Sequence, residues 1–233
     1  MRKVGRGRAI LLNFAIDAFP TYGDTEGARP PADSESIQTG TGFFRHLFTS
    51  AGVHAAVTVK AVDGHHPRQT EIVRWRNGET ILLALFREYG EVEQANVELP
   101  EARHVYDLRN RNDLGQVTSF ATSIIPYRAT FLALTPAAVL PVQMTIADTV
   151  IKRGQPVKLS LTCPGADGTR AVLIRVHDAN RAEARHLRQV IMVDADGATA
   201  VLPIAYNDPT GKWTVTAVEL FTNSATNLSM NVQ

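Results

Sequence analysis

The sequence has only one cysteine, Cys163, among its 233 residues. A lone cysteine cannot form a disulfide within the chain, and it cannot supply the several thiolates of a zinc cage. Because Cys163 ends the strand-like segment KLSLTCPG, we expect a buried, unreactive thiol there. The scarcity of cysteine therefore excludes a disulfide scaffold and a thiolate metal site.

Net charge is also nearly absent, since 24 basic side chains balance 23 acidic ones to give +1. Such a balance provides no electrostatic basis for binding nucleic acid or an anionic membrane surface. We interpret the small basic cluster at the N-terminus as a solvated tail; it consists of Arg2, Lys3, Arg6 and Arg8. No nucleic-acid partner is predicted.

Long hydrophobic runs are missing as well. No stretch approaches the roughly 18 apolar residues that a membrane-spanning helix needs. The N-terminal segment AILLNFAIDAF superficially resembles a signal peptide, but Asn13 and Asp17 interrupt it and no convincing cleavage site follows. We therefore expect neither a membrane span nor a signal peptide, and the compartment stays open.

Signatures of catalysis are equally sparse. The sequence has no G-x-S-x-G nucleophile elbow, and the pair His65-His66 lacks a third metal ligand at short range. The segment DADG at 194–197 lacks the downstream glutamate of a calcium loop, so a hairpin turn is expected. Several glutamates lie beside turns and strand ends, where solvated surface charge is the expected role: Glu71, Glu79, Glu88, Glu91 and Glu93. We predict no catalytic, metal-binding or cofactor-binding residue.

The segment EIVRWRNGETILLALFR, residues 71–87, predicts a β-hairpin. Asn77-Gly78 suits a two-residue type I′ turn, because both residues tolerate positive φ. Before the turn, Val73 and Trp75 point to one face while the residues between them point to the other. After it, six consecutive apolar residues, 81–86, indicate a strand covered on both sides.

The rest of the chain reads mostly as strands. We expect a buried strand at 8–16, a long loop rich in Pro, Gly and Ser, and a helix at 41–51 whose Phe43, Leu47 and Phe48 face is packed. Strand-like segments with turns every 8 to 12 residues or so then run to about residue 136. After a short proline-containing linker, a second series of about seven strands begins at Val142, as in an immunoglobulin-like sandwich.

Residues 5 to 136 resemble the C-terminal portion of bacterial glycoside hydrolases of the family 42 β-galactosidase type. GRGRAILLNFAI and FFRHLFTSAGV are similar to the last strand and helix of the flavodoxin-like trimerisation domain of that family. The hairpin, VELPEARHVYDLRNRNDLG and IIPYRATFLALTP are similar to its small antiparallel C-terminal domain. The last 90 or so residues resemble a bacterial Ig-like or macroglobulin-like module. The family's two catalytic glutamates lie upstream of the matching region, so no position here corresponds to them.

The expected fold is mainly β, with an antiparallel β-sandwich and an Ig-like β-sandwich preceded by a short α/β segment. We expect the flavodoxin-like remnant at 1–53, the antiparallel sandwich at 54–137 and the Ig-like sandwich at 142–233. The resemblance implies a C-terminal piece of a larger protein or a truncated reading frame. It implies a non-catalytic accessory region that supports assembly or positions a catalytic domain, with a catalytic barrel or further copies of the chain as partners.

A carbohydrate-binding module is the alternative function, and an independent glycoside hydrolase is a further one. Sugar binding requires exposed aromatic rings, and aromatic residues make up only 7% of the chain. The candidates for stacking on a sugar are Trp75, Tyr89, Tyr106 and Tyr127. Trp213 also lies in an alternating strand, where packing in the core is the expected role, as for Trp75.

Overall fold

A computed structural model describes residues 2–4, 7–9, 34–67 and 70–233. Near the N-terminus, β1 (Arg2–Val4) pairs antiparallel with β2 (Gly7–Ala9). The strand predicted at 8–16 lies outside the described residues beyond Ala9. The helix α1 (Ser34–Ser50) starts earlier than the predicted residue 41. No helix in the described ranges is both long and apolar enough to cross a membrane.

The aromatic face of α1 is more exposed than its helical spacing predicted. Phe43 and Phe48 are 40% and 53% exposed, and Leu47 is half-buried. The Phe44 ring lies 5.4 Å from that of Phe43 and 6.5 Å from that of Phe48, measured between centroids. The predicted burial of the Phe43–Leu47–Phe48 face is therefore wrong for two of its three members.

The first β-sandwich is built from one curled antiparallel sheet. Its strands pair in the order β3-β6-β8-β5-β4, and β7 pairs with β6 along the edge opposite to β3 and β8. Their bounds are β3 (Thr58–Ala61), β4 (Thr70–Asn77), β5 (Thr80–Arg87), β6 (Glu93–Asp107), β7 (Asn112–Ile124) and β8 (Thr130–Thr135). The inner face of the curl holds an apolar core: Val59, Leu83, Leu85, Ala95, Val97, Val105, Ile124, Leu132 and Leu134.

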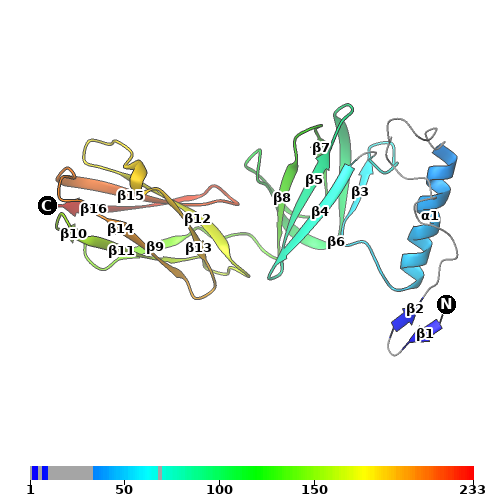
Figure 1. Ribbon diagram of the computed structural model, residues 1–233, viewed down its shortest axis with the longest axis horizontal. Helices are drawn as coiled ribbons and strands as arrows, with labels where there is room; N and C mark the ends of the chain where they lie inside the picture. Colours follow the sequence, from blue (N-terminus) through cyan, green and yellow to red (C-terminus); the bar gives the residue numbers. More distant parts are fainter. Residues whose placement is uncertain (1, 5–6, 10–33, 68–69) are drawn as a thin grey trace.

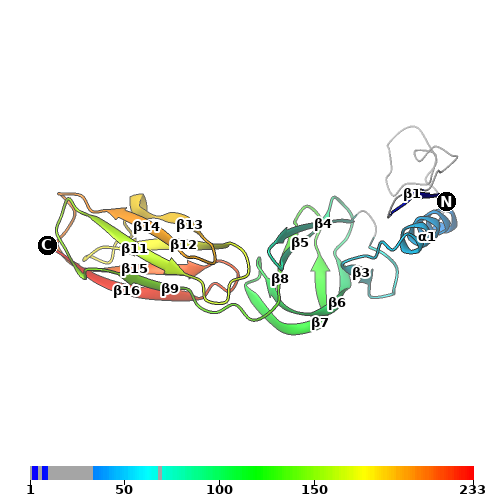
Figure 2. The same ribbon diagram turned by 90° about the horizontal axis from the view of Figure 1, so that it is seen from below.

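β6 runs as one long strand from Glu93 to Asp107. Its pairing with β7 is interrupted between Glu98 and Arg103, and it shifts register again between Val105 and Tyr106. Pro100 lies in the first interruption, where its missing N–H costs no ladder hydrogen bond. These irregularities let the β6–β7 hairpin bend strongly, as bulged strands do. The bend curls the sheet, as Figure 2 shows.

The hairpin at 71–87 forms as predicted, but its turn is displaced by one residue. Asn77 pairs with Thr80, so Gly78 and Glu79 occupy the turn instead of Asn77 and Gly78. Of the two, only Gly78 has positive φ, at 62°, which fits a type II′ turn rather than the predicted type I′. On β5, Leu83, Ala84 and Leu85 are buried, so this strand is covered on both faces. Its partner β4 is an edge strand and is largely exposed.

The second β-sandwich has two sheets, ordered β10-β16-β15-β12-β13 and β14-β11-β9. Alternation is clear in β11, where every second side chain is buried. The core between the sheets includes Trp213, fully buried, and Cys163, 7% exposed as expected. The bounds are β9 (Gln143–Ile146), β10 (Val150–Ile151), β11 (Pro156–Thr162), β12 (Arg170–His177), a short 3₁₀-helix η2 (Arg185–Leu187), β13 (Gln189–Val193), β14 (Ala198–Pro203), β15 (Gly211–Glu219) and β16 (Ala225–Val232).

The predicted turn at 194–197 is present, with the Gly197 N–H donating to the Asp194 carbonyl oxygen at 3.1 Å. It connects β13 to β14, which belong to different sheets. The turn therefore links the two layers of the sandwich and does not close a simple hairpin.

Figures 1 and 2 show the two sandwiches arranged end to end, with α1 beyond the first of them. The chain crosses between the sandwiches through residues 136–142. The tip of the β4–β5 hairpin points toward the second sandwich at this crossing, so a turn of the first unit meets a loop of the second.

Candidate functional site

The glutamates that glycoside hydrolysis would require are not brought together. Glu71 pairs with Phe86 near one end of the β4–β5 hairpin, and Glu79 lies in the turn beyond Asn77, six positions further along β4. At about 3.3 Å per residue they are separated by roughly 20 Å, far beyond the roughly 5 to 9.5 Å between the carboxyls of a glycosidase. These two side chains cannot act on one glycosidic bond.

Glu93 differs from its predicted role as a solvated surface charge. Its side chain is 16% exposed and forms ion pairs with Arg87 and with His65, the latter at 2.8 Å between Nε2 and Oε1. His65 also contacts Asp63. Among the described residues no group of three His, Cys, Asp or Glu side chains could hold a metal ion. Glu93 therefore anchors the loop after β3 to the end of β5.

His66 faces away from this ion pair. Its Nδ1 lies 3.2 Å from the Val59 carbonyl oxygen, and its Nε2 contacts Arg45 of α1. Burial lowers the pKa of His66, and the neighbouring Arg45 charge lowers it further. The imidazole is thus kept neutral, which suits its role in tethering α1 to the first sandwich.

The four aromatic candidates for sugar stacking do not form one row. Tyr106 is 2% exposed and its hydroxyl accepts a hydrogen bond from the Val139 N–H at 2.8 Å, so its ring is not accessible. Trp75 is 49% exposed on β4, opposite Leu82. Tyr127, 77% exposed, donates its N–H to the Arg87 carbonyl oxygen at the far end of β5.

The positions of these rings follow from the strand register. Leu82, opposite Trp75, and Arg87, bonded to Tyr127, are five residues apart on β5, about 16 Å at the rise of a strand. Tyr89 is half-buried near Arg87, whose Nε donates to the Tyr89 carbonyl oxygen. Trp75 and Tyr127 therefore belong to separate surfaces.

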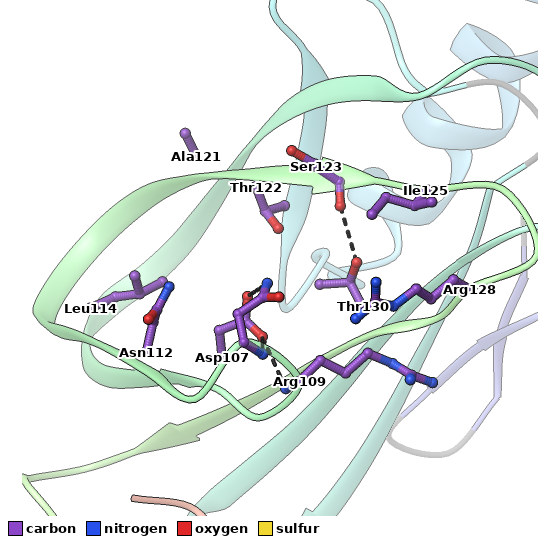
Figure 3. Close-up of a pocket in the computed structure, with 11 residues that line it drawn as sticks. Asp107, Arg109, Asn112, Leu114, Ala121, Thr122, Ser123, Ile125, Arg128 and Thr130 are labelled. Carbon is purple, nitrogen blue, oxygen red and sulfur yellow. Dashed lines mark hydrogen bonds between the residues drawn. The ribbon is translucent and has the colours of Figure 1, made fainter.

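The bend of the β6–β7 hairpin creates a polar cavity of about 280 Å³ (Figure 3). The cavity lies between the β6–β7 turn, the second half of β7 and the start of β8, and it opens to solvent. Its lining consists of Asp107, Arg109, Asn110, Asn112, Leu114, Ala121, Thr122, Ser123, Ile125, Arg128 and Thr130. Its volume is close to the lower end of the range typical of small-molecule pockets, about 300 to 1,000 Å³.

Asp107 is the one carboxylate in this lining, and its acceptor capacity is used by the turn. Its Oδ1 accepts the N–H groups of Arg109 and Asn110, both at 3.0 Å, and its Oδ2 accepts the Asn110 side-chain amide at 2.7 Å. Asp107 is 7% exposed. It therefore holds the β6–β7 turn in shape and is not disposed to act as an acid or base.

Two arginines border the cavity on one side. Arg109 is fixed by its Nε, which donates to the Ala129 carbonyl oxygen, and by its guanidinium carbon 5.4 Å from the Phe131 ring centroid. The Arg128 side chain reaches toward Thr130 (Figure 3), and its guanidinium makes no hydrogen bond or ion pair with the residues that the structure describes. The two guanidinium groups outnumber the one carboxylate of the lining, Asp107, so the cavity carries a net positive charge.

Tyr127 lies in an unusual turn whose outer residues, Ile125 and Arg128, line this cavity. The Arg128 N–H donates to the Ile125 carbonyl oxygen at 3.3 Å, which closes a β-turn with Pro126 and Tyr127 at its centre. Tyr127 has φ of 59°, so the turn is type II, in which glycine or asparagine normally holds this position. A tyrosine there costs about 1 to 3 kcal/mol of backbone strain.

Sequence reasoning found Tyr127 but missed Arg109, Asn112 and Arg128. The available signals were Pro126, which marks a turn, and the alternating basic and amide residues RNRN at 109–112. Neither signal indicates that the two turns meet, because their contact depends on the curl of the sheet.

A second polar cluster joins the two sandwiches. Asn77 at the hairpin tip donates its Nδ2 to the Thr169 carbonyl oxygen at 2.7 Å, and its Oδ1 accepts the Thr169 N–H at 3.1 Å. The Glu79 N–H donates to Asp167 Oδ2 at 2.7 Å. We call this set, with Gly78 and Gly168 between its members, the hairpin junction.

Behind the hairpin junction lie two buried side chains of opposite charge. Arg170 is 3% exposed and Glu219 is fully buried. Burial lowers the pKa of Arg170, while the carboxylate of Glu219 opposes that shift. Glu219 Oε2 accepts hydrogen bonds from the Phe221 N–H and from both the N–H and the hydroxyl of Thr222. Arg170 also lines a small cavity of about 70 Å³ with the linker residues 136–140 and Cys163.

No protein-family model matches the chain, and neither does any curated protein. Among solved structures, a polysaccharide lyase aligns over 70% of this chain at 10% identity, with a TM-score of 0.28. The glycoside hydrolase domain of Endo-D from Streptococcus pneumoniae R6 aligns over 75% at 7% identity, with a TM-score of 0.26. The chain spans 26% and 37% of these two proteins. Both are carbohydrate-active proteins, but similarity this low carries no argument about function.

Proposed function

We propose that this chain is a non-catalytic accessory region of a carbohydrate-active, glycoside-hydrolase-like protein, which holds other parts of that protein in position. The observation that carries the proposal is the hairpin junction, which connects two independent apolar cores end to end. The hydrogen bonds of the hairpin junction join the two sandwiches, and the junction presents no reactive group. The resemblance of residues 5–136 to a non-catalytic part of glycoside hydrolases supports the carbohydrate context.

Geometry at the junction supports a fixed connection. A Cβ added to Gly168 would lie 2.6 Å from the Asn77 carbonyl oxygen, and one added to Gly78 would lie 2.8 Å from Asp167 Oδ1. Such close backbone approach is a use of glycine that leaves little room for rotation. A two-point hydrogen bond between Asn77 and Thr169 further restricts the angle between the sandwiches.

We infer in addition that the second sandwich is an Ig-like module. In its support, strands from near the start and from the end of the second sandwich share a sheet, since β10 pairs parallel with β16. Trp213, near the start of β15, donates its Nε1–H to the Pro209 carbonyl oxygen four residues upstream, at 2.9 Å. This contact is similar to the tyrosine corner of Ig-like sandwiches, where an aromatic residue bonds back to the preceding backbone.

The direct test is a panel of chromogenic aryl glycosides, including a β-galactoside, incubated with the purified chain. We expect turnover at background, since Asp107 is the one carboxylate that lines the polar cavity, and Glu71 and Glu79 lie too far apart to act on one bond. The variants Glu71→Gln and Glu79→Gln serve as matched controls. Turnover that either substitution abolishes would make the chain an enzyme and contradict the proposal.

Carbohydrate binding is the second candidate function, and the cavity in the bent β6–β7 hairpin favours it. The cavity combines guanidinium, amide and hydroxyl groups, and the exposed Tyr127 lies in the turn between two of its lining residues, Ile125 and Arg128. Sugar sites use such a combination of polar contacts with an aromatic surface. A structural role and a binding role are compatible, because the cavity and the hairpin junction lie on different parts of the first sandwich.

A further inference from the structure

The charge of the polar cavity is the starting point. Arg109 and Arg128 border it, and Arg111 follows Arg109 in the same turn. The carboxylate of Asp107 is occupied by three donors of its own turn. The whole chain carries a formal net charge of only +1, so this local excess is not part of a generally basic surface. The cavity is therefore suited to an anionic group.

The uncharged polar groups of the cavity indicate which class of anionic ligand it suits. Asn112 and Thr122 line the cavity, and neither side chain makes a hydrogen bond to the residues that the structure describes. An amide and a hydroxyl can each donate and accept, so they match a ligand with several hydroxyl groups. Guanidinium groups prefer planar anions, and a carboxylate satisfies that geometry. Among the units of common polysaccharides, a uronic acid combines several hydroxyls with a carboxylate.

The turn beside the cavity carries an exposed aromatic ring, which is a surface on which a sugar ring can stack. Tyr127 is 77% exposed and is held at φ of 59° by a turn whose outer residues, Ile125 and Arg128, line the cavity. Arg111, at the opposite turn, also has positive φ, at 56°. Strained non-glycine residues cluster at binding sites, where the strain persists because it positions a side chain. Here the strained turn holds an exposed tyrosine next in sequence to Arg128, a lining residue of the cavity.

We propose that this cavity binds a uronic acid unit of an acidic saccharide, with Arg128 and Arg109 on the carboxylate and the ring of Tyr127 against the sugar. This inference rests on the second candidate function, carbohydrate binding, and adds the ligand class and the residues. The size of the cavity, about 280 Å³, suits a single sugar unit with the rest of the saccharide in solvent.

The test is isothermal titration of the whole chain with a short oligogalacturonide, compared with a neutral galactan oligosaccharide of equal length. Dextran sulfate serves as a general polyanion. We expect the oligogalacturonide to bind at least about tenfold more tightly than the neutral saccharide. Arg128→Gln should weaken that binding by roughly ten- to a hundredfold, because charge-assisted hydrogen bonds are lost.

Tyr127→Gly separates binding from folding, since glycine relieves the positive φ while it removes the ring. We expect an unchanged or higher melting temperature together with weaker binding. The matched controls are Arg185→Gln and Tyr206→Gly on the second sandwich, both exposed, which should leave binding unchanged.

Equal affinity for the acidic and the neutral saccharide would overturn this inference while leaving carbohydrate binding in place. Absence of binding to either would overturn both, and the accessory role would still be tested independently at the hairpin junction. Equal binding of dextran sulfate, weakened as much by Arg185→Gln as by Arg128→Gln, would also refute the inference, because general electrostatic attraction would then explain the result.

Discussion

Replacement of Gly168 by alanine should open the connection between the two sandwiches without unfolding either. Gly168 has φ of 95°, and a Cβ there would lie 2.6 Å from both the carbonyl oxygen and Oδ1 of Asn77. The carbonyl belongs to the backbone of the β4–β5 hairpin, so a side-chain rotation cannot relieve the contact. The sandwiches must move apart by several tenths of an ångström or more.

The expected free-energy change has two parts. Positive φ for alanine costs about 1 to 3 kcal/mol and acts within the second sandwich. Separation of the sandwiches additionally weakens the two bonds between Asn77 and Thr169 and the bond from the Glu79 N–H to Asp167. Neutral hydrogen bonds contribute about 0.5 to 1.5 kcal/mol each and those to charged groups about 1.5 to 3, so the junction loses up to about 3 to 6 kcal/mol.

Hydrogen exchange measures this loss directly, because two amides of the junction donate across it. We expect the N–H groups of Glu79 and Thr169 to exchange at least about tenfold faster in Gly168→Ala. Amides in the core strands β5 and β15 should keep their protection. Small-angle scattering should show a broader distribution of particle dimensions as the angle between the sandwiches varies.

Gly165→Ala is the matched control. Gly165 lies in the same loop and has φ of 66°, but nothing lies within 4 Å of an added Cβ. This variant measures the backbone strain alone, so it should lower stability without faster exchange at Glu79. If the two variants exchange alike, or if Gly168→Ala leaves both junction amides protected, the junction does not hold the sandwiches together.

Three further outcomes follow from burial. Glu219→Ala should cost about 3 to 5 kcal/mol in urea unfolding, because it leaves the buried Arg170 without its compensating charge; a loss below about 1 kcal/mol would contradict that role. Leu85→Ala should lower the free energy of unfolding by about 2 to 5 kcal/mol, because Leu85 is buried in the first core. Phe48→Ala, at a half-exposed position, should lower it by less than about 1 kcal/mol. Similar losses for both variants would show that α1 is packed. Burial raises the pKa of Cys163, so the native thiol should resist iodoacetamide until denaturant is added, and stability should fall as pH rises past about 9, where only the unfolded thiol ionises; rapid native labelling would refute this.

Much of the β architecture follows from the sequence, for local reasons. The apolar run 81–86 predicts a strand covered on both faces, and β5 is such a strand. Alternation in the segment PVKLSLT predicts one buried face, and β11 buries every second residue. These patterns are reliable because side chains of a strand alternate with a period of two whatever the rest of the chain does.

Predictions from local sequence patterns were wrong where long-range contacts determine the structure. The exposure of Phe43 and Phe48 on α1 contradicts a helical spacing that normally indicates a packed face. The turn of the β4–β5 hairpin lies at Gly78-Glu79, and the asparagine that favoured Asn77-Gly78 instead bonds to Thr169, 92 residues away. A side chain that suits a turn can equally suit a contact with another unit, and sequence does not distinguish the two.

The polar cavity shows most clearly which features depend on local sequence and which depend on tertiary structure. Sequence by itself determined the strands of this region and Tyr127 as a candidate ring. Tertiary structure alone decided that Arg109 and Arg128 share one cavity, since the interrupted pairing between Glu98 and Arg103 bends the β6–β7 hairpin until its two ends approach. The degree of that bend depends on packing over the whole sheet, whereas each strand and turn depends on a few neighbouring residues.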